Sequence, residues 1–326
     1  MKRFISYRSF VLSFYSCIIH LSKTLVAKRP ENICNKNCYI QNIFMSEELP
    51  NCNFKILNGQ QKLIKFLKGD KKEFSNHFDL QPWENAYEKL EAFQINFKSK
   101  EIVIKLKEAL KTIEEILDKY SLEQISLSFN GGKDCTLLLH LLRACVNRKY
   151  GENKQINAFY IKSNDEFPEI INFVHSISEK YNLNIFEFNG PLKTGLIYLK
   201  SQKPEIIATL MGSRSTDPKA AKMKSKCEWT EPDWPPFLRV CPLLDMTYSD
   251  VWILLRSLCI PYCSLYDQGY SSLGERSKTM KNPHLIIKEN NGNEKEKYLP
   301  AYMLDDEKFE RIFREDRASE NEKPEN

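Results

Sequence analysis

Lys133 and Asp134 directly follow a pair of glycines, Gly131 and Gly132, near the middle of this 326-residue chain. A lysine ammonium carries a full positive charge that attracts phosphate, and an aspartate carboxylate can hold a Mg²⁺ carried by a polyphosphate. Glycines have no Cβ, so a ligand can come close to the backbone. These residue types in this order indicate a site for a polyphosphate and its metal ion.

The neighbouring residues predict a strand before the glycines and a helix after them. Ile125, Leu127 and Phe129 alternate with serines, as in a strand, and residues 137–142 are largely apolar. A strand, a glycine turn and a helix aim unpaired N–H groups and the positive end of the helix dipole at one point, which favours an anion. A bare Gly-Gly would more often be an ordinary turn. The set found here is more specific, and comprises Ser128, Asn130, Gly131, Gly132, Lys133, Asp134 and Thr136.

This motif differs from the G-x-x-x-x-G-K-[ST] loop of kinases and GTPases, because the first glycine is missing and aspartate follows lysine. It resembles the PP-loop of the ATP pyrophosphatase superfamily, usually S-x-G-G-x-D-[ST], whose members cut ATP between the α and β phosphates. Here Asn130 stands beside the glycines and Cys135 fills the Ser/Thr position. The variant S-x-N-G-G-K-D-C resembles one branch in particular, the eukaryotic FAD synthases.

A second candidate segment reads M-G-S-R-S-T-D-P and follows an apolar run at 206–211. Its Arg214 suits a phosphate, since the planar guanidinium binds oxygens in pairs, and Asp217 lies three residues on. A solvated turn with a chance Arg and Asp is the alternative. The segment resembles the G-x-R-x-x-D-P motif of FAD synthases, which implies that Arg214 and Asp217 lie at the flavin-nucleotide site.

Further motifs extend the resemblance to residues 125–314. They are F-P-E at 167–169, D-W-P-P-F-L-R-V-C-P-L-L-D at 233–245, P-Y-C-S-L-Y-D-Q-G-Y-S-S-L-G at 261–274, and P-A-Y followed by E-R-I-F-R. The spacing of Arg311 and Arg314 predicts that both lie on one face of a helix, where a solvated face is the simpler interpretation. The resemblance implies that they bind FMN. Met246 stands where the family usually has tryptophan.

Strand and helix patterns alternate along the chain and predict an α/β fold. The expected helices cover 101–120, a segment that begins at Pro168, a segment that ends near 201, and one capped by Thr247. The expected strands cover 125–129, 158–161, 184–188, 206–211 and 237–244, with a long loop at 219–236 that contains Trp229 and Trp234. We expect a three-layer, doubly wound, mostly parallel sheet of the adenine nucleotide alpha hydrolase-like PP-loop type, with a helical N-terminal extension and a C-terminal flavin-site segment. Ligands of such sheets lie at the carboxyl ends of the strands, which brings the loops after Phe129, Ile161 and Met211 together.

The predicted domain organisation has three parts. Residues 1–44 hold seven basic residues and one acidic residue, so we expect a leader or extension outside the fold. The PP-loop catalytic domain covers 45–316, and residues 317–326 form a disordered tail.

The charge balance and hydropathy bear on the partners. Because the residues after 44 are nearly neutral despite the net charge of +5, we expect no nucleic-acid partner. Residues 10–21 are too short and too polar to span a bilayer, so we expect no membrane association, and a monomer.

Ten cysteines are scattered along the chain and none forms a C-x-x-C. Free thiols in a reducing compartment are the favoured interpretation over zinc or disulfides. The predicted location is therefore the cytoplasm, or mitochondria if residues 1–44 are a targeting leader.

The resemblance implies an FMN adenylyltransferase, which makes FAD and pyrophosphate from ATP and FMN with Mg²⁺. The implied catalytic residues are Asn130, Lys133, Asp134, Arg214 and Asp217, with Asp134 on the metal, and the implied FMN ligands are Arg214, Asp217, Arg311 and Arg314.

A phosphoadenylyl-sulfate reductase-like enzyme would need a cysteine near its C-terminus, and the last one here is Cys263. A tRNA-thiolating enzyme would need paired cysteines and a basic surface. A catalytically silent nucleotide-binding regulator is the non-enzyme alternative.

Overall fold

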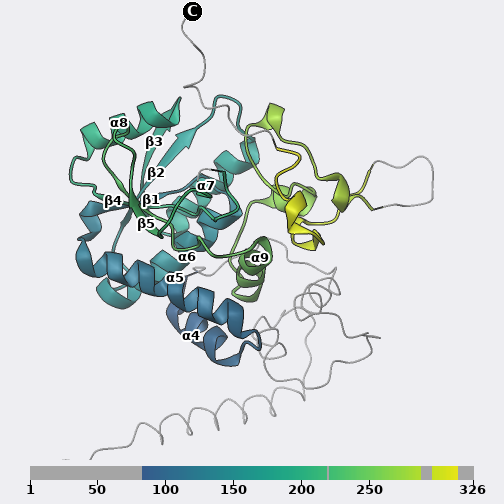
Figure 1. Cartoon of the computed structure of the whole chain (residues 1–326), viewed down its shortest axis with the longest axis horizontal. Helices are drawn as coiled ribbons and strands as arrows, with labels where there is room; N and C mark the ends of the chain where they lie inside the picture. The colour runs from purple at the N-terminus through teal and green to yellow at the C-terminus, as the bar shows by residue number, and fades with distance from the viewer. Residues whose placement is uncertain (1–82, 219, 288–295, 315–326) are drawn as a thin grey trace, which may run out of the picture. The chain divides into compact units, whose positions relative to one another are not determined.

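The computed structural model describes residues 83–218, 220–287 and 296–314 (Figure 1). The predicted leader at 1–44, the following residues up to 82 and the predicted tail at 317–326 lie outside this part of the chain. The domain boundaries at 44 and 316 therefore stay predictions.

One six-stranded sheet forms the centre of the described fold, in the order β3-β2-β1-β4-β6-β5. All neighbouring strands are parallel except β5 and β6, which are antiparallel. This confirms the mostly parallel sheet predicted from the alternation of strands and helices. The strands are β1 (Ile125–Ser128), β2 (Ile156–Lys162), β3 (Leu183–Asn189), β4 (Ala208–Leu210), β5 (Cys227–Trp229) and β6 (Leu238–Val240).

Helices cover both faces of the sheet, as the doubly wound pattern requires. Helix α8 (Leu192–Gln202) packs on β2 and β3, on the side of the sheet opposite to α5 and α6 (Figure 1). Helix α6 (Lys133–Tyr150) is in turn covered by three others. These are α4 (Ala86–Asn96), α5 (Lys100–Lys119) and α9 (Tyr248–Ser257), while α7 (Pro168–Lys180) packs on β3.

Local sequence explains why several helices begin where they do. Pro168 occupies the first turn of α7, where its missing N–H is no loss. Thr247 accepts a hydrogen bond from the backbone N–H of Asp250, and Asp250 accepts one from Thr247 in return, which closes the predicted cap of α9. Helix α5 buries the apolar stripe expected from its spacing, including Leu106, Ala109 and Ile113.

The strand order places β1 beside β4, although the chain leaves β1 towards β2. The carboxyl ends of β1 and β4 therefore lie side by side, at the edge where ligands of such sheets bind. Both candidate segments of the sequence, at 130–136 and 211–218, follow these two strands. The fold thus brings them together, as the sequence predicts.

Two predicted boundaries are wrong. The strand expected at 237–244 ends at Val240, because Pro242 follows and the backbone N–H of Leu244 turns back to the carbonyl of Cys241 at 3.1 Å. The loop expected at 219–236 contains β5, which pairs with the edge of the sheet. Within that loop Trp234 packs on a buried cluster around Phe159 and Phe237, whereas Trp229 is exposed. Trp234 therefore anchors the loop.

The predicted helix that would carry Arg311 and Arg314 is also absent from the described chain. Residues 307–309 form a short 3-10 turn (η7, Glu307–Phe309), and Arg314 lies in an isolated antiparallel bridge with Thr279. Contacts with distant segments fix this stretch, so the spacing of Arg311 and Arg314 does not place them on one face of a helix. Among the described residues no helix is long and apolar enough to cross a membrane.

Candidate active site

The turn between β1 and α6 needs both of its glycines. Gly131 has φ +72°, and a Cβ there would lie 3.0 Å from the side chain of Val174 on α7. Gly132 caps α6, and its N–H donates to Asn130 Oδ1 at 3.1 Å. The thiol of Cys135 donates to the same oxygen at 2.7 Å. The Asn130 side chain therefore holds the turn in shape at the amino end of α6.

Gly212 lets the loop after β4 lie directly on the first turn of α6. A Cβ on this residue would lie 2.5 Å from the backbone nitrogen of Cys135 and 2.8 Å from the carbonyl carbon of Asp134. Backbone cannot yield as a side chain can, so only glycine fits. This contact sets how closely Arg214, two residues on, approaches Asp134.

Four charged side chains meet at this point: Lys133, Asp134, Arg214 and Glu310. Lys133 Nζ lies 3.0 Å from Asp134 Oδ2 and also contacts Glu310 Oε1. Arg214 Nη2 donates to both oxygens of Glu310 at 2.6 Å. Arg214 Nε lies 2.8 Å from Asp134 Oδ1, as an ion pair without an aligned hydrogen bond. We call these four residues the charge cluster.

The charge cluster is deeply buried, and its ion pairs favour the charged forms of Asp134 and Arg214. The side chains of Lys133 and Arg214 are 2% and 1% exposed, while Asp134 retains 19%. Burial alone would raise the pKa of Asp134, but Lys133 and Arg214 outweigh it and hold that pKa below its usual range. Burial would lower the pKa of Arg214, but Asp134 and Glu310 raise it above its ordinary value. The cluster is thus two cations bound to two carboxylates.

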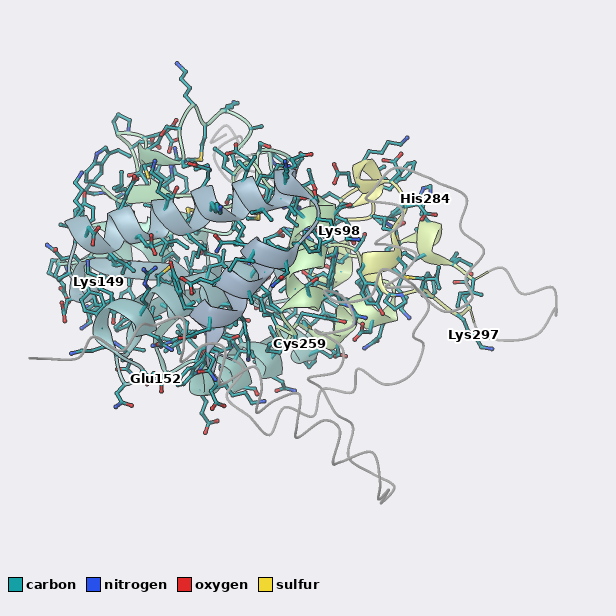
Figure 2. All side chains as sticks on the ribbon, turned by 90° about the horizontal axis from the view of Figure 1, so that it is seen from below. Lys98, Lys149, Glu152, Cys259, His284 and Lys297 are labelled. Atoms are coloured by element: carbon teal, nitrogen blue, oxygen red, sulfur yellow. The ribbon has the colours of Figure 1, made fainter. Side chains whose placement is uncertain are left out.

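Aromatic residues from the C-terminal half line the amino end of α6. The Tyr266 hydroxyl accepts a hydrogen bond from the backbone N–H of Lys133 at 2.9 Å. Lys133 Nζ lies 5.1 Å from the ring centre of Tyr248, which favours a cation. Figure 2 places Lys149, near the carboxyl end of α6, on the opposite side of the described fold from His284, whose ring stacks on Phe309. The amino end of α6 therefore faces the C-terminal segments.

Asp217 connects the loop after β4 to the C-terminal segment. Its Oδ2 accepts from the backbone N–H of Arg214 at 2.8 Å, and its Oδ1 lies 2.5 Å from Arg311 Nη1. Arg314 lies in a neighbouring position, with Nη1 donating to Ser272 at 3.1 Å. Arg214, Asp217 and Arg311 are therefore brought together, as the resemblance implies.

Thr136 and Ser128, which the motif predicts at the ATP site, lie on either side of the glycine turn. Thr136 is fully buried and its hydroxyl donates to the carbonyl of Gly132 at 2.8 Å. Ser128 is the last residue of β1 and is half-buried. Thr136 thus holds the first turn of α6.

Three residues that the sequence interpretation missed take part in the site: Gly212, Tyr266 and Glu310. A glycine directly after a strand was the signal for Gly212. The signal for Glu310 was its position next to Arg311 in the E-R-I-F-R motif. Tyr266 gave no separate signal within a segment rich in tyrosine.

The donor set suits a magnesium ion that arrives with a polyphosphate. No group of three or more His, Cys, Asp or Glu in the described ranges could hold a metal by itself. Asp134 Oδ1 is nevertheless buried without a hydrogen-bond partner. Mg²⁺ commonly takes only one or two protein carboxylates and completes its coordination shell with phosphates and water. The single carboxylate of Asp134 fits this way of binding.

The thiols near the site are not suited to nucleophilic chemistry. Burial raises the pKa of Cys135 to about 12 and that of Cys263 to about 11. A thiol attacks as the thiolate, so both side chains are neutral and packed at neutral pH.

Sequence comparisons show what this chain is similar to. Residues 124–202 and 187–281 match the phosphoadenosine phosphosulfate reductase domain. A probable FAD synthase of Caenorhabditis briggsae is 52% identical over 242 residues, 73% of this chain and 46% of that protein. A probable FAD synthase of Schizosaccharomyces pombe is 38% identical over 211 residues, 63% of this chain and 77% of that protein. The chain thus spans about half the length of the C. briggsae relative.

Solved structures give the same likeness. Candida glabrata FMN adenylyltransferase in complex with FMN and the ATP analogue AMPCPP has a TM-score of 0.64 at 26% identity, over 72% of this chain and 98% of that one. The same enzyme in complex with FAD and inorganic pyrophosphate has a TM-score of 0.64 at 27% identity, with the same coverage.

Proposed function

This chain belongs to the FAD synthase family, and from that premise we propose that it is an FMN adenylyltransferase, which transfers AMP from ATP to FMN and releases pyrophosphate. One observation carries the proposal. Lys133 is the first residue of α6 and Arg214 lies in the loop after β4, and both bind the Glu310 carboxylate. A carboxylate held by two cations beside a helix N-terminus marks a site that suits phosphate oxygens.

The reaction needs one bond to form and one to break. A phosphate oxygen of FMN attacks the α-phosphorus of ATP, and the bond from that phosphorus to the α,β-bridging oxygen breaks, so pyrophosphate leaves with the electron pair. The attacking phosphate is already an anion, so no strong general base is needed. Positioning and charge neutralisation then account for most of the catalysis.

Lys133 and Arg214 are assigned to the leaving pyrophosphate and the developing negative charge. Both are buried, and buried charges act more strongly than exposed ones because water screens them less. The positive end of the α6 dipole also favours the pyrophosphate. The N–H groups of Gly132 and Lys133 donate to Asn130 and Tyr266 in the free protein.

Asp134 would hold Mg²⁺, with Asn130 nearby. When bound, the ion neutralises polyphosphate charge and orients the phosphate oxygens. The support for this assignment is Asp134 Oδ1, a buried carboxylate oxygen that forms an ion pair with Arg214 Nε at 2.8 Å but no aligned hydrogen bond.

Arg311 and Arg314 are assigned to the FMN phosphate, with Asp217 as the residue that orients Arg311. Asp217 also accepts a hydrogen bond from the backbone N–H of Arg214. One carboxylate therefore contacts both Arg311, assigned to FMN, and Arg214, assigned to pyrophosphate. The resemblance implied FMN contacts for Arg214 and Asp217. Because Arg214 shares Glu310 with Lys133, we propose pyrophosphate as its ligand instead, with Asp217 as a positioning residue. The monomeric state, the absence of a nucleic-acid partner and the location in the cytoplasm or mitochondria stay predictions.

A reductase mechanism finds no support in the described part of the chain. It would require an accessible nucleophilic cysteine in the C-terminal region, whereas Cys263 is fully buried and its pKa is raised. No cysteine follows it in the sequence.

A substrate comparison tests the proposal. Purified protein is incubated with ATP and Mg²⁺ and with either FMN or riboflavin, and the flavins are separated by chromatography. FAD should form only from FMN, because riboflavin lacks the attacking phosphate. Formation of no adenylated flavin from FMN would refute the proposed activity.

A further inference from the structure

Glu310 occupies the place where the proposed function puts phosphate oxygens. Its carboxylate contacts Lys133 Nζ and binds Arg214 Nη2 through both oxygens at 2.6 Å. Glu310 itself is only 5% exposed. While the Glu310 carboxylate stays bound, it occupies hydrogen-bond donors of Lys133 and Arg214 and neutralises part of their charge, so both bind a phosphate less strongly.

The charge cluster is electrically balanced, with two cations against the carboxylates of Asp134 and Glu310. A cluster of net charge zero attracts a polyphosphate weakly. If the Glu310 carboxylate leaves, one net positive charge remains, and its three contacts with Lys133 and Arg214 become available to phosphate oxygens. Asp134 cannot play this part equally well, since it is adjacent to Lys133 in the chain and fixed on α6.

One donor in the cluster is still unused. Arg214 Nη1 is buried and has no hydrogen-bond partner among the described residues. Buried guanidinium nitrogens are rarely left without one. Arg214 Nη1 therefore offers a phosphate oxygen a further donor once Glu310 leaves the cluster.

Glu310 can move without releasing its segment. The segment is also held by Asn282, whose amide donates to the carbonyl of Phe309 at 2.9 Å, and by the ion pair of Arg311 with Asp217. The Glu310 carbonyl accepts from the Ser271 hydroxyl at 2.8 Å. These contacts involve backbone or other side chains, so rotation of the Glu310 carboxylate leaves them in place.

We propose that the Glu310 carboxylate is an internal competitor of the polyphosphate, which holds Lys133 and Arg214 together in the free protein and is displaced when phosphate oxygens bind them. The inference rests on the proposed function, since it takes ATP and pyrophosphate as the ligands of this cluster. It predicts that removing the charge of Glu310 strengthens polyphosphate binding. If Glu310 instead only positioned the two cations, its removal would weaken binding.

The test is the affinity of inorganic pyrophosphate, with Mg²⁺, for wild type and for Glu310→Gln, measured by isothermal titration calorimetry. The variant should have a Kd at least about tenfold lower than wild type, the factor expected when a charged competitor of two hydrogen-bonded cations becomes neutral. Glu307→Gln is the matched control. Its carboxylate lies in the same segment but accepts from the backbone N–H of Tyr248 instead, so its Kd should equal that of wild type.

An unchanged or higher Kd for Glu310→Gln would overturn the inference. Pyrophosphate binding needs neither FMN nor turnover, so the result stands apart from the FAD assay. A protein that shows the tenfold effect but makes no FAD would refute the proposed function alone.

A second measurement uses the wild-type chain, in case the variant fails to fold. In a crystal structure of wild type with pyrophosphate and Mg²⁺, phosphate oxygens should bind Lys133 Nζ and Arg214 Nη2, and the Glu310 carboxylate should have left both. Bound pyrophosphate with Glu310 still on both cations would contradict the inference.

Discussion

Arg311 Nη1 lies 2.5 Å from Asp217 Oδ1, and this ion pair joins two loops that are 94 positions apart in the sequence. The other oxygen of Asp217 accepts the backbone N–H of Arg214 at 2.8 Å. One carboxylate therefore sets both the direction of a flavin-side arginine and the backbone of an ATP-side arginine. The two substrates of the proposed reaction meet where these loops meet.

Arg314→Ala should weaken FMN binding selectively. Loss of one charge-assisted contact to a phosphate is expected to raise the KM for FMN by about tenfold or more, with the KM for ATP much less changed. Steady-state kinetics with each substrate varied in turn measure both values. Arg148→Ala is a suitable control, because Arg148 pairs with Glu114 on the surface of α5 and α6. An FMN response equal to that of the control would leave Arg314 with a structural role, without a part in FMN binding.

Asp134→Asn should keep the fold and lose most FAD formation. The amide has the shape of the carboxylate but not its charge, so the proposed metal loses its protein ligand, and kcat/KM should fall by at least about tenfold. Asp118→Asn removes an exposed carboxylate that pairs with Lys149 and should leave turnover unchanged. Near-normal turnover of the Asp134 variant at saturating Mg²⁺ would remove Asp134 from the metal site.

Gly212→Ala should damage both stability and turnover, because the new Cβ would lie 2.5 Å from the backbone nitrogen of Cys135. Overpacking of this kind costs about 1–3 kcal/mol of the free energy of unfolding. Gly151→Ala provides the comparison, since Gly151 has a positive φ but open space around its Cβ position. Urea unfolding gives the stabilities, and a smaller loss at Gly212 than at Gly151 would show that the loop after β4 can move away from α6.

His140 should make the fold less stable at acidic pH. Burial lowers the pKa of His140 from 6.5 to about 3. Below pH 6.5 the imidazole is therefore protonated in the unfolded chain but stays neutral in the folded chain. The free energy of unfolding falls as the pH falls. Between pH 7.5 and 5.5 this residue should lower the free energy of unfolding by about 1.4 kcal/mol. His140→Gln should lack that part of the pH dependence in urea unfolding. Equal pH dependence in the two proteins would mean that folded His140 protonates normally.

The sheet and the meeting of two loops were predictable from the sequence because both follow from local patterns. The apolar alternation of 125–129 and the periodicity of α5 are read within a few residues, and the order of strands and helices then fixes a parallel sheet. The carboxyl-end rule places Lys133 and Arg214 near one another. How closely they approach depends on the contact of Gly212 with the first turn of α6. The periodicity of apolar residues does not predict such a contact between distant segments.

The C-terminal part of the site was predictable only in its residue types. Glu310 meets Lys133 across 177 positions of sequence, and no local pattern encodes such a contact. The spacing of Arg311 and Arg314 suggested a helix, but Asp217, Ser272 and the bridge to Thr279 hold this stretch in another form. Tertiary contacts outweigh the propensity of so short a segment.

The most direct test of the account follows the α-phosphorus of ATP. Wild-type protein is incubated with Mg²⁺, FMN and ATP labelled with ³²P at the α position. Labelled FAD is counted over time, and the unlabelled pyrophosphate is measured by a coupled enzymatic assay. The account predicts that the label enters FAD and that one pyrophosphate appears for each FAD. Label that stays in ATP, or that is released as AMP without FAD, would contradict it.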